Sequence, residues 1–398
     1  MENLLPLEGI RVLDLSQIMA GPFCAMVLAD LGADVIKIEK PNGGDDSRQM
    51  GPFVNGESVC YFQINRNKRG VCLDLKSAEG LELFYELVKT ADILIENFRP
   101  GVTKSLKIDY ETLHEINPGL VYGSISGYGQ TGPYAHKGGF DLIAQGMTGL
   151  MAMTGYPDKP PAKAGVAVYD IGAGLTAAYG ILAAYIQKQR TGIGQHVDVS
   201  LAEAGLPWYA WEAAAYFGAG ELPKRTGSRH RVSAPYQAYR TRDGYVVLGC
   251  ANQRNWEKFC RQVVDKPEWL DDPRFKTNSD RARHADDLEV LIEEVFGTQD
   301  SAYWLERCEA AGVPAGPIYT LDDVVRDPHY LARDMVVEVE HPVIGRMKMF
   351  GIPTKYSEEQ PTVRRAAPLL GQHTDEVLSE LGVGADRLQA LRDRGVIR

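Results

Sequence analysis

The sequence lacks an apolar segment suited to crossing a membrane, and its start does not resemble a leader. The stretch 171–187 is uncharged and rich in alanine and glycine, but it is shorter than the roughly 20 residues that a membrane helix needs. The first residues, Met1-Glu2-Asn3-Leu4, contain neither a basic region nor a signal-type apolar run. We therefore expect a soluble protein without membrane contact, resident in the cytoplasm, or in the mitochondrial matrix after loss of a transit peptide if its source is a eukaryote.

Cysteine is scarce, and its spacing excludes two kinds of site. No C-x-x-C pair or His/Cys spacing indicates a zinc site or a disulfide framework. The six cysteines are scattered along the chain: Cys24, Cys60, Cys72, Cys250, Cys260 and Cys308. We expect buried thiols in a reducing compartment, and no metal.

Positive charge is also in short supply, because the formal net charge is −10. This balance argues against a nucleic-acid-binding protein, so any anionic ligand must meet a local cluster of basic residues. The remaining composition, 44% apolar and 24% charged, is that of an ordinary globular protein. A chain of 398 residues is long enough for two or three domains.

Strands and helices alternate through the first third of the chain. Apolar runs predict strands at 10–15, 34–39, 71–75, 92–98 and 120–126. Helices are predicted between them, from Pro22 to Gly32, from Ser77 to Thr90, and after Asp109. This alternation is typical of an α/β protein with a parallel, doubly wound sheet. After the first strand, Ala20-Gly21-Pro22 stands where a G-x-G-x-x-G turn would be, which disfavours nicotinamide and flavin dinucleotides.

One carboxylate, Asp170, lies in an unusual setting. The run Gly165–Asp170 is predicted as a short strand that leads through a glycine-rich turn into an apolar helix at 175–187. The start of a helix favours an ionised carboxylate, and glycines let a bulky ligand approach the backbone. These features suit a carboxylate nucleophile. Aspartate is equally a common helix cap, and this stretch alone leaves both interpretations open.

The second half of the chain changes in composition. An aromatic helical segment covers 198–217, a basic loop with glycine covers 225–231, and a hairpin is predicted from 236–240 and 245–250. Further helices are predicted near 256–264, 285–295 and 301–311, with one in the tail at 374–381. We expect a large domain at 1–200, a linker at 201–225, a small α+β domain at 226–325, a second linker at 326–350, and a C-terminal segment at 351–398.

Several motifs, taken together, resemble one protein family. They are Leu7–Asp14, Leu31–Glu39, Asn67-Lys68-Arg69, Glu96–Gly101, Gly127–Pro133 and Leu370–Leu378. In this order they are similar to the class III CoA-transferases, the family of formyl-CoA transferase and carnitine CoA-transferase. The resemblance implies a Rossmann-like large domain completed by the C-terminal segment, an inserted small domain, and two chains interlocked as a homodimer. It also implies that Asp170 is the nucleophile, which attacks an acyl-CoA and passes the CoA to a small carboxylic acid.

The resemblance also implies which residues bind coenzyme A. Gln17, Ile18, Met19 and Ala20 would line the first turn, and Lys40, Leu73 and Lys76 the nucleotide end. The rest of this predicted set is Asn97, Phe98, Arg99, Lys104, Lys137 and Asp141. The family often carries an arginine a few residues after Pro100-Gly101, where this chain has Lys104. A solvated surface charge is the alternative for each lysine or arginine.

Phe140 distinguishes the transferases from the acyl-CoA racemases of the same fold. Those racemases carry a proton-transferring histidine before the acid that matches Asp141, and phenylalanine cannot move a proton. A racemase is therefore the weaker alternative, and a CoA-binding protein without catalysis is a second one. Arg229 and His230 fall near a loop that is glycine-rich in formyl-CoA transferase. Because arginine pairs with carboxylates in a directional way, we expect a dicarboxylate substrate, with succinyl-CoA as donor. These side chains could instead bind a CoA phosphate or the other subunit.

Overall fold

The computed structural model describes residues 4–398, so the first three residues, on which the expectation about a leader partly rests, lie outside the described residues. The chain forms two compact units. The first contains the chain up to Gly149, Ala164–Ala214 and Pro328–Arg398, and the second contains Leu150–Lys163 and Ala215–Asp327. The five-part division of the chain stays a prediction. Among the described residues, no helix combines the length and apolar character needed to cross a membrane.

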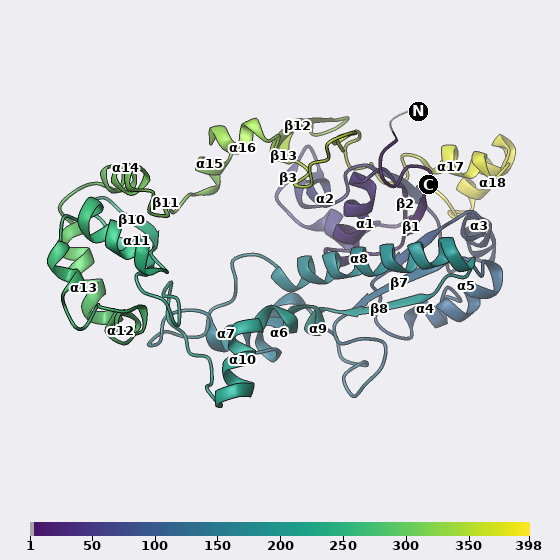
Figure 1. Ribbon diagram of the computed structural model, residues 1–398. Coiled ribbons are helices and arrows are strands. Elements are labelled where there is room, and N and C mark those ends of the chain that lie inside the picture. The colour runs from purple at the N-terminus through teal and green to yellow at the C-terminus, as the bar shows by residue number, and fades with distance from the viewer. Residues whose placement is uncertain (1–3) are drawn as a thin grey trace. The chain divides into compact units, whose positions relative to one another are not determined.

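A six-stranded parallel sheet forms the centre of the first unit, which confirms the predicted α/β class (Figure 1). Its order is β5-β2-β1-β6-β7-β8, with β1 Arg11–Asp14, β2 Asp34–Glu39, β5 Lys68–Cys72, β6 Ile93–Glu96, β7 Val121–Ser126 and β8 His196–Ser200. From β1 the chain builds outward to β5, then returns to the other side of β1 with β6. The order therefore reverses between β1 and β6, and open α/β sheets bind ligands at the carboxyl ends of strands beside such a reversal.

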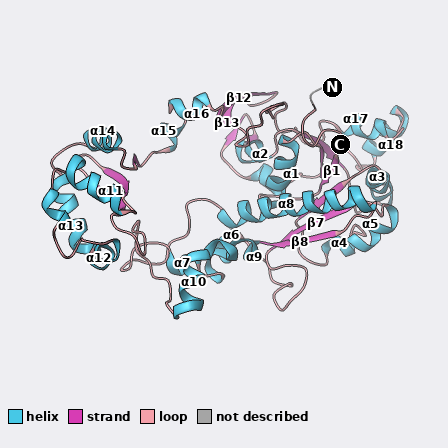
Figure 2. Cartoon of the chain, viewed as in Figure 1, coloured by secondary structure: helices cyan, strands magenta, loops and turns pink. Residues whose placement is uncertain are grey.

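Helices cover both faces of this sheet (Figure 2). Helix α1, Ala20–Asp30, packs against the long helix α8, Val168–Thr191, on one face. Glycine permits this contact, because a Cβ at Gly174 would lie 2.8 Å from the Ala20 carbonyl oxygen. The opposite face contacts α3 Ala78–Lys89, α5 Tyr110–Ile116, and the C-terminal helices α17 Thr374–Glu380 and α18 Ala385–Asp393, in one continuous apolar core.

Several predicted elements differ from the structure. The segment predicted as helical over 198–217 becomes helical only at Leu201, because His196–Ser200 form strand β8 and pair with β7. Residues 165–167 do not form the predicted strand, and α8 already begins at Val168, so that Asp170 lies in its first turn. A short apolar run is compatible with either structure, and here the backbone N–H of Tyr169 donates to the Asp141 carboxylate, which supports the start of a helix. The third strand of this sheet along the chain, the edge strand β5, begins at Lys68 rather than Val71, because Lys68 and Arg69 are themselves buried and paired.

Smaller elements complete the first unit. They are β3 Phe53–Val54, β4 Glu57–Ser58, α2 Val59–Ile64, α4 Val102–Ser105, α6 Asp141–Met147, α9 Leu201–Gly205, α16 Pro328–Ala332, β12 Val336–His341 and β13 Gly345–Phe350. Short 3-10 turns cover Asp46–Gln49 and Leu206–Tyr209. Helix α10, Ala210–Ala219, runs from the first unit into the second.

The second unit is an α+β structure with its own core. Its antiparallel sheet has the order β11-β10-β9, with β9 Tyr236–Arg240, β10 Tyr245–Gly249 and β11 Ala315–Pro317, which confirms the predicted hairpin. Its helices are α7 Leu150–Met153, α11 Gln253–Lys258, α12 Asn278–Arg283, α13 Ala285–Phe296, α14 Ser301–Ala311 and α15 Leu321–Val324, with a π-helical turn at Phe259–Val263 and a 3-10 turn at Pro267–Leu270. Buried aromatic rings, including Trp256 and Phe296, fill the space between sheet and helices.

Candidate active site

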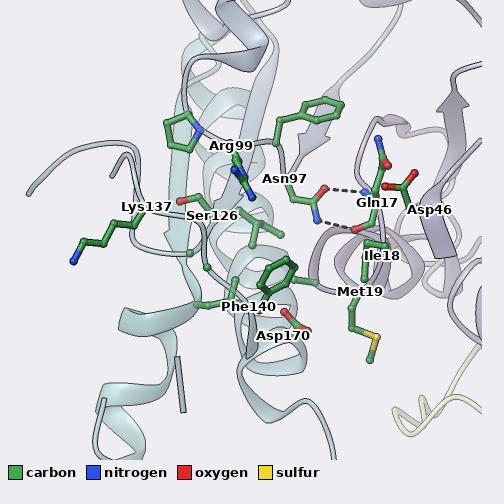
Figure 3. A pocket seen from close by; sticks show the side chains of 17 residues that line it. Gln17, Ile18, Met19, Asp46, Asn97, Arg99, Ser126, Lys137, Phe140 and Asp170 are labelled. Carbon is green, nitrogen blue, oxygen red and sulfur yellow. Dashed lines mark hydrogen bonds between the residues drawn. The ribbon is translucent and has the colours of Figure 1, made fainter. Parts of the chain in front are cut away.

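A pocket of about 330 Å³ opens at the carboxyl edge of the sheet, where the strand order reverses. It is lined by the loop after β1, the loop after β6, the loop after β7, and the first turn of α8: Gln17, Ile18, Met19, Ala20, Asp46, Asn97, Phe98, Arg99, Pro100, Ile125, Ser126, Gly127, Lys137, Gly139, Phe140, Asp170 and Leu201. Most of the predicted site residues thus meet in one place (Figure 3). They come together because parallel strands end on the same edge.

The loop after β1 is held in an unusual conformation. Ile18 has a φ of +68°, in the left-handed region, which is unfavourable for a β-branched residue and costs about 1–3 kcal/mol. Asn97 donates to the Gln17 carbonyl at 2.8 Å and accepts from the Gln17 N–H at 2.7 Å (Figure 3). Asn97 therefore links the ends of β1 and β6 across the reversal.

Asp170 lines this pocket without a hydrogen-bonding partner among residues 4–398. Burial, together with the nearby negative charge of Asp141, raises the pKa of Asp170 to about 6. We expected the helix start to favour the ionised form, and this expectation is wrong in sign, because burial outweighs the helix end. A carboxyl group with this pKa is still mostly ionised at pH 7. Figure 3 shows the Phe140 ring beside it.

Asp141 supports the first turn of α8 and does not line the pocket. Its Oδ1 accepts the Tyr169 N–H at 2.8 Å, and its Oδ2 accepts the Gln145 side-chain amide at 2.6 Å. Both oxygens therefore already have donors. Its predicted contact with coenzyme A stays a prediction, and its observed contacts position the residue next to Asp170.

A second pocket, of about 230 Å³, adjoins the first and shares Gln17 and Phe98 with it. Its wall is mostly apolar, with Leu15, Ile38, Leu73, Leu75, Phe98, Val102 and Leu106, and its charged lining consists of Lys40 and Lys76 together with Glu39, Asp45 and Asp74. The Lys40 ammonium lies 2.9 Å from Asp46, and Lys76 is exposed. Apolar walls with cations suit a planar base with attached phosphates, which is the chemistry predicted for this end of the ligand.

The other predicted cations differ in how they face the first pocket. Arg99 and Lys137 are exposed and line it. The Lys137 ammonium lies 3.7 Å from the centre of the Tyr134 ring, and Figure 3 shows this side chain extending away from Asp170. Lys104 is exposed on α4 and lines neither of the two pockets, so its role toward a phosphate stays a prediction.

Arg229 and His230 belong to the second unit. The Arg229 guanidinium donates to Asp286 at 2.6 Å, to Glu289, and to the Gln237 side chain at 3.0 Å. Two carboxylates of the same unit therefore already balance its charge. His230 packs its ring on Tyr236 and accepts the Val232 N–H at 3.2 Å. The predicted role of both residues in binding a substrate carboxylate is untested, and the pairing of Arg229 gives it no support.

Sequence reasoning missed several residues of the site. Gly127 and Gly139 approach so closely that a Cβ on Gly139 would lie 2.4 Å from the Gly127 Cα, and this contact brings the loop of Phe140 to the end of β7. The sequence feature that could have indicated this contact was the two glycine pairs, Gly127/Gly129 and Gly138/Gly139, which were interpreted only as loop residues. Glu96, at the end of β6, lines neither of the two pockets, and burial raises its pKa to about 7. No group of three or more potential metal ligands occurs in the described part of the chain.

Comparison with known proteins places this geometry in a family. The family described as CoA-transferase family III matches residues 7–374. The human succinyl-CoA:glutarate CoA-transferase is 39% identical over 382 residues, which are 96% of this chain and 87% of the human protein. The succinate–glutarate CoA-transferase of Agrobacterium fabrum is 40% identical over 383 residues, covering 94% of this chain and 96% of that protein.

The fold gives the same result. The crystal structure of a CAIB/BAIF family protein from Brucella suis superposes with a TM-score of 0.85 at 39% sequence identity, covering 96% of this chain and all of that one. The resemblance first noted in the motifs is thereby confirmed. The chain belongs to CoA-transferase family III and is an enzyme that transfers coenzyme A.

Proposed function

We propose that this enzyme moves CoA from succinyl-CoA to a short dicarboxylate through covalent intermediates on Asp170. The observation that carries the proposal is the setting of Asp170, a partly buried carboxylate without a hydrogen-bond donor in the described chain, on a pocket beside the strand-order reversal. A nucleophile needs a free lone pair, and a carboxylate held by several donors would be a weaker one.

The first half of the reaction releases the donor acid. An Asp170 oxygen attacks the thioester carbonyl of the acyl-CoA, the carbon–sulfur bond breaks, and a mixed anhydride and CoA thiolate form. The thiolate then attacks the aspartyl carbonyl of the anhydride. The donor leaves as a free carboxylate, and Asp170 is left as a thioester with CoA.

The second half runs the same steps in reverse. The acceptor carboxylate attacks the aspartyl thioester, which gives a second mixed anhydride and again frees the thiolate. Attack of the thiolate on the acceptor carbonyl forms the new acyl-CoA and returns Asp170 to its carboxylate. Each step exchanges one acyl bond for another, so no proton has to be moved by a histidine.

Water must be kept from the anhydride, which hydrolyses easily. The apolar side chains of Ile18, Met19 and Phe140 line the pocket around Asp170. These side chains support the proposal, because they offer no hydrogen bonds to water beside the reacting carboxylate.

The choice of a dicarboxylate rests on similarity. Relatives that are 39–40% identical to this chain are named for succinyl-CoA or succinate with glutarate. The prediction that Arg229 and His230 bind the second carboxylate would require Arg229 to exchange one of its present partners. The named relatives therefore support the substrate class better than this loop does.

The nucleophile is tested with two substitutions. We expect D170A and D170N to lower the rate of CoA transfer by about a thousandfold or more while the circular dichroism spectrum stays that of the wild type. Wild-type enzyme incubated with succinyl-CoA should gain the mass of CoA less one water on the peptide that contains Asp170, and hydroxylamine should release the CoA. Retained turnover in either variant would reject Asp170 as nucleophile.

The substrate class is tested with a panel of acceptors. With succinyl-CoA as donor, we expect glutarate to be accepted at least about tenfold better than acetate in kcat/KM, because a paired second carboxylate adds a charge-assisted hydrogen bond. Equal kcat/KM values for acetate and glutarate would exclude a dicarboxylate site.

We also propose a homodimer and a cytoplasmic or mitochondrial-matrix location. The side chains of Trp211 and Phe217 on α10 are 77% and 83% exposed, and large exposed aromatic residues are typical of association surfaces. Light scattering during size-exclusion chromatography gives the assembly state, and a monomer mass at micromolar concentration would contradict a dimer.

A further inference from the structure

Two consecutive peptide groups after β1 have their polar atoms bound by side chains from other segments. The Ser16 carbonyl accepts from the Lys37 ammonium at 2.8 Å, and the Gln17 N–H donates to Asn97 at 2.7 Å. In the next peptide group, the Gln17 carbonyl accepts from Asn97 at 2.8 Å. Because side chains from other segments hold these peptide groups by hydrogen bonds, the turn has little freedom to change its conformation.

The remaining N–H of this turn, that of Ile18, donates to Asp45 Oδ1 at 3.0 Å. The same carboxylate accepts from the backbone and hydroxyl of Ser47, both at 2.8 Å, and its other oxygen lies 3.0 Å from the Lys37 ammonium. The side chains of Lys37 and Asp45 are completely buried. They form an ion pair inside the unit, directly behind the turn that lines the pocket of Asp170.

Both partners of this pair are charged. Burial disfavours ionisation of each, but the carboxylates of Asp14 and Asp45 outweigh it and raise the pKa of Lys37. For Asp45, Lys37 and the backbone donors outweigh burial and lower the pKa to about 2. A buried ion pair is seldom the most stable choice for a core, so its presence here calls for another reason.

The turn itself supplies this reason. Ile18 holds a positive φ although its branched side chain opposes it, and the same side chain lines the pocket. We propose that Lys37 and Asp45 are positioning residues, which hold the Ser16–Met19 turn in this conformation so that the pocket keeps its shape around Asp170. This inference rests on the proposed use of the Asp170 pocket for CoA transfer.

A double-mutant cycle tests the proposal. The variants are D45A, D45N, I18G and the double variants D45A/I18G and D45N/I18G, and the measurement is kcat and KM for CoA transfer. In the wild-type background we expect D45A to lower kcat by about tenfold or more, and D45N to lower it less, because asparagine still accepts the Ile18 N–H. In the I18G background the loss should fall below about threefold, because glycine adopts the positive φ unaided.

The matched control is D30N. Asp30 is also buried and ion-paired, with Arg66 at 2.7 Å, but in residues 4–398 none of its side-chain hydrogen bonds or ion pairs reaches the turn. It should lower the melting temperature and leave the kcat of the folded enzyme within about threefold. If D45A does not fold, the cycle with D45N decides. Equal losses in both Ile18 backgrounds, or a loss of kcat in D30N as large as that in the Asp45 variant, would overturn the proposal.

The outcome is separate from that for Asp170. If D170N remains active but the Asp45 and Ile18 losses are coupled, the nucleophile is wrong and the positioning role stands. If D170N is inactive and the losses are independent, the nucleophile stands and the positioning role is rejected.

Discussion

Asp170 lies at a helix start, yet its pKa moves upward. A charge at a helix end is worth about 0.3–1 kcal/mol, which is less than the 1.36 kcal/mol of one pKa unit. Burial can shift a carboxyl pKa by about 3–5 units. Asp170 is partly buried and close to a second carboxylate, so the larger effects both favour the neutral form. The Asp170 carboxylate is therefore mostly ionised near neutral pH and becomes protonated in mild acid.

This pKa predicts an acid limit to catalysis. Below a pH of about 6, Asp170 takes up a proton and can no longer attack a thioester, so kcat/KM for the acyl-CoA should fall about tenfold per pH unit. Above that pH the rate should level off. The measurement is the pH profile of kcat/KM between about pH 4.5 and 8, which spans the titration of such a group. A flat profile down to about pH 4.5 would contradict the predicted acid limit.

Removing the neighbouring charge should move this limit. In D141N the Coulombic contribution of Asp141 is lost, so the pKa of Asp170 falls and the acid limb of the profile shifts to lower pH. Gln145 serves as the control: Q145L also removes the amide donor to Asp141, but it keeps the Asp141 charge and adds no new one. An unchanged acid limb in D141N would mean that burial alone sets the pKa.

At the scale of single residues, sequence reasoning predicted much of the pocket lining, including Asp170, because the motif residues follow strand ends. It could not separate residues that face a pocket from those that lie beside it. Lys104 and Lys137 both lie close to glycines in the sequence, but Lys104 is in helix α4, and of the two only Lys137 lines the pocket. The sequence could not show that Arg229 is already paired, because its partners Asp286 and Glu289 lie more than fifty residues further along the chain. Arg229 was therefore predicted to bind a substrate carboxylate.

At the scale of elements, the contact between α1 and α8 sets where Asp170 stands. A methyl group at Gly174 would lie 2.8 Å from the Ala20 carbonyl oxygen. This backbone atom cannot change rotamer to relieve the clash, so helix α1 would have to shift. We predict that G174A destabilises the fold by about 1–3 kcal/mol. It should also lower kcat, because Ala20 lines the pocket. The measurements are urea denaturation followed by circular dichroism and steady-state kinetics.

Gly180 in the same helix provides the control. Its added methyl would lie 3.2 Å from a side-chain methyl of Val197, which can move. G180A also gains about 1 kcal/mol of helix propensity, so its net effect should be close to zero. Equal destabilisation by both substitutions would show that the contact with α1 is not the cause.

Strand β5 illustrates why a charged motif can be a core element. Lys68 is completely buried, and its ammonium donates to Asp14, to Asn65 and to the Pro22 carbonyl at 2.8–2.9 Å. Arg69 pairs with Asp34 and with two glutamates of α17. The pattern Asn67-Lys68-Arg69 therefore connects this strand to β1 and to the C-terminal segment. Because these charged residues were not expected in a strand, the sequence analysis predicted that the strand begins at Val71, three residues too late.

At the scale of the whole molecule, the C-terminal segment completes the first unit. Its apolar side chains join the core under the sheet, and the Asp74 N–H donates to the Val396 carbonyl at 2.8 Å. Leu391 is fully buried there. We predict that L391A lowers the free energy of unfolding by about 2–5 kcal/mol, as measured by urea denaturation.

The control is in the same helix. Gln389 is exposed, and within residues 4–398 its side chain hydrogen-bonds only to Asp393, at 2.8 Å. Q389A should therefore change the free energy of unfolding by about 0.5 kcal/mol or less. A small effect of L391A would mean that the segment packs on the unit without belonging to its core.

The sequence by itself determined the parallel α/β class and the family, and it singled out Asp170 as the predicted nucleophile, because periodicity, caps and motifs act over short distances along the chain. Only the tertiary structure decided that Asp170 lies in the first turn of α8, that burial and Asp141 raise its pKa, and that Arg229 is already paired. These properties depend on side chains brought together from distant parts of the chain. Desolvation and charge act through space, so no local pattern records them.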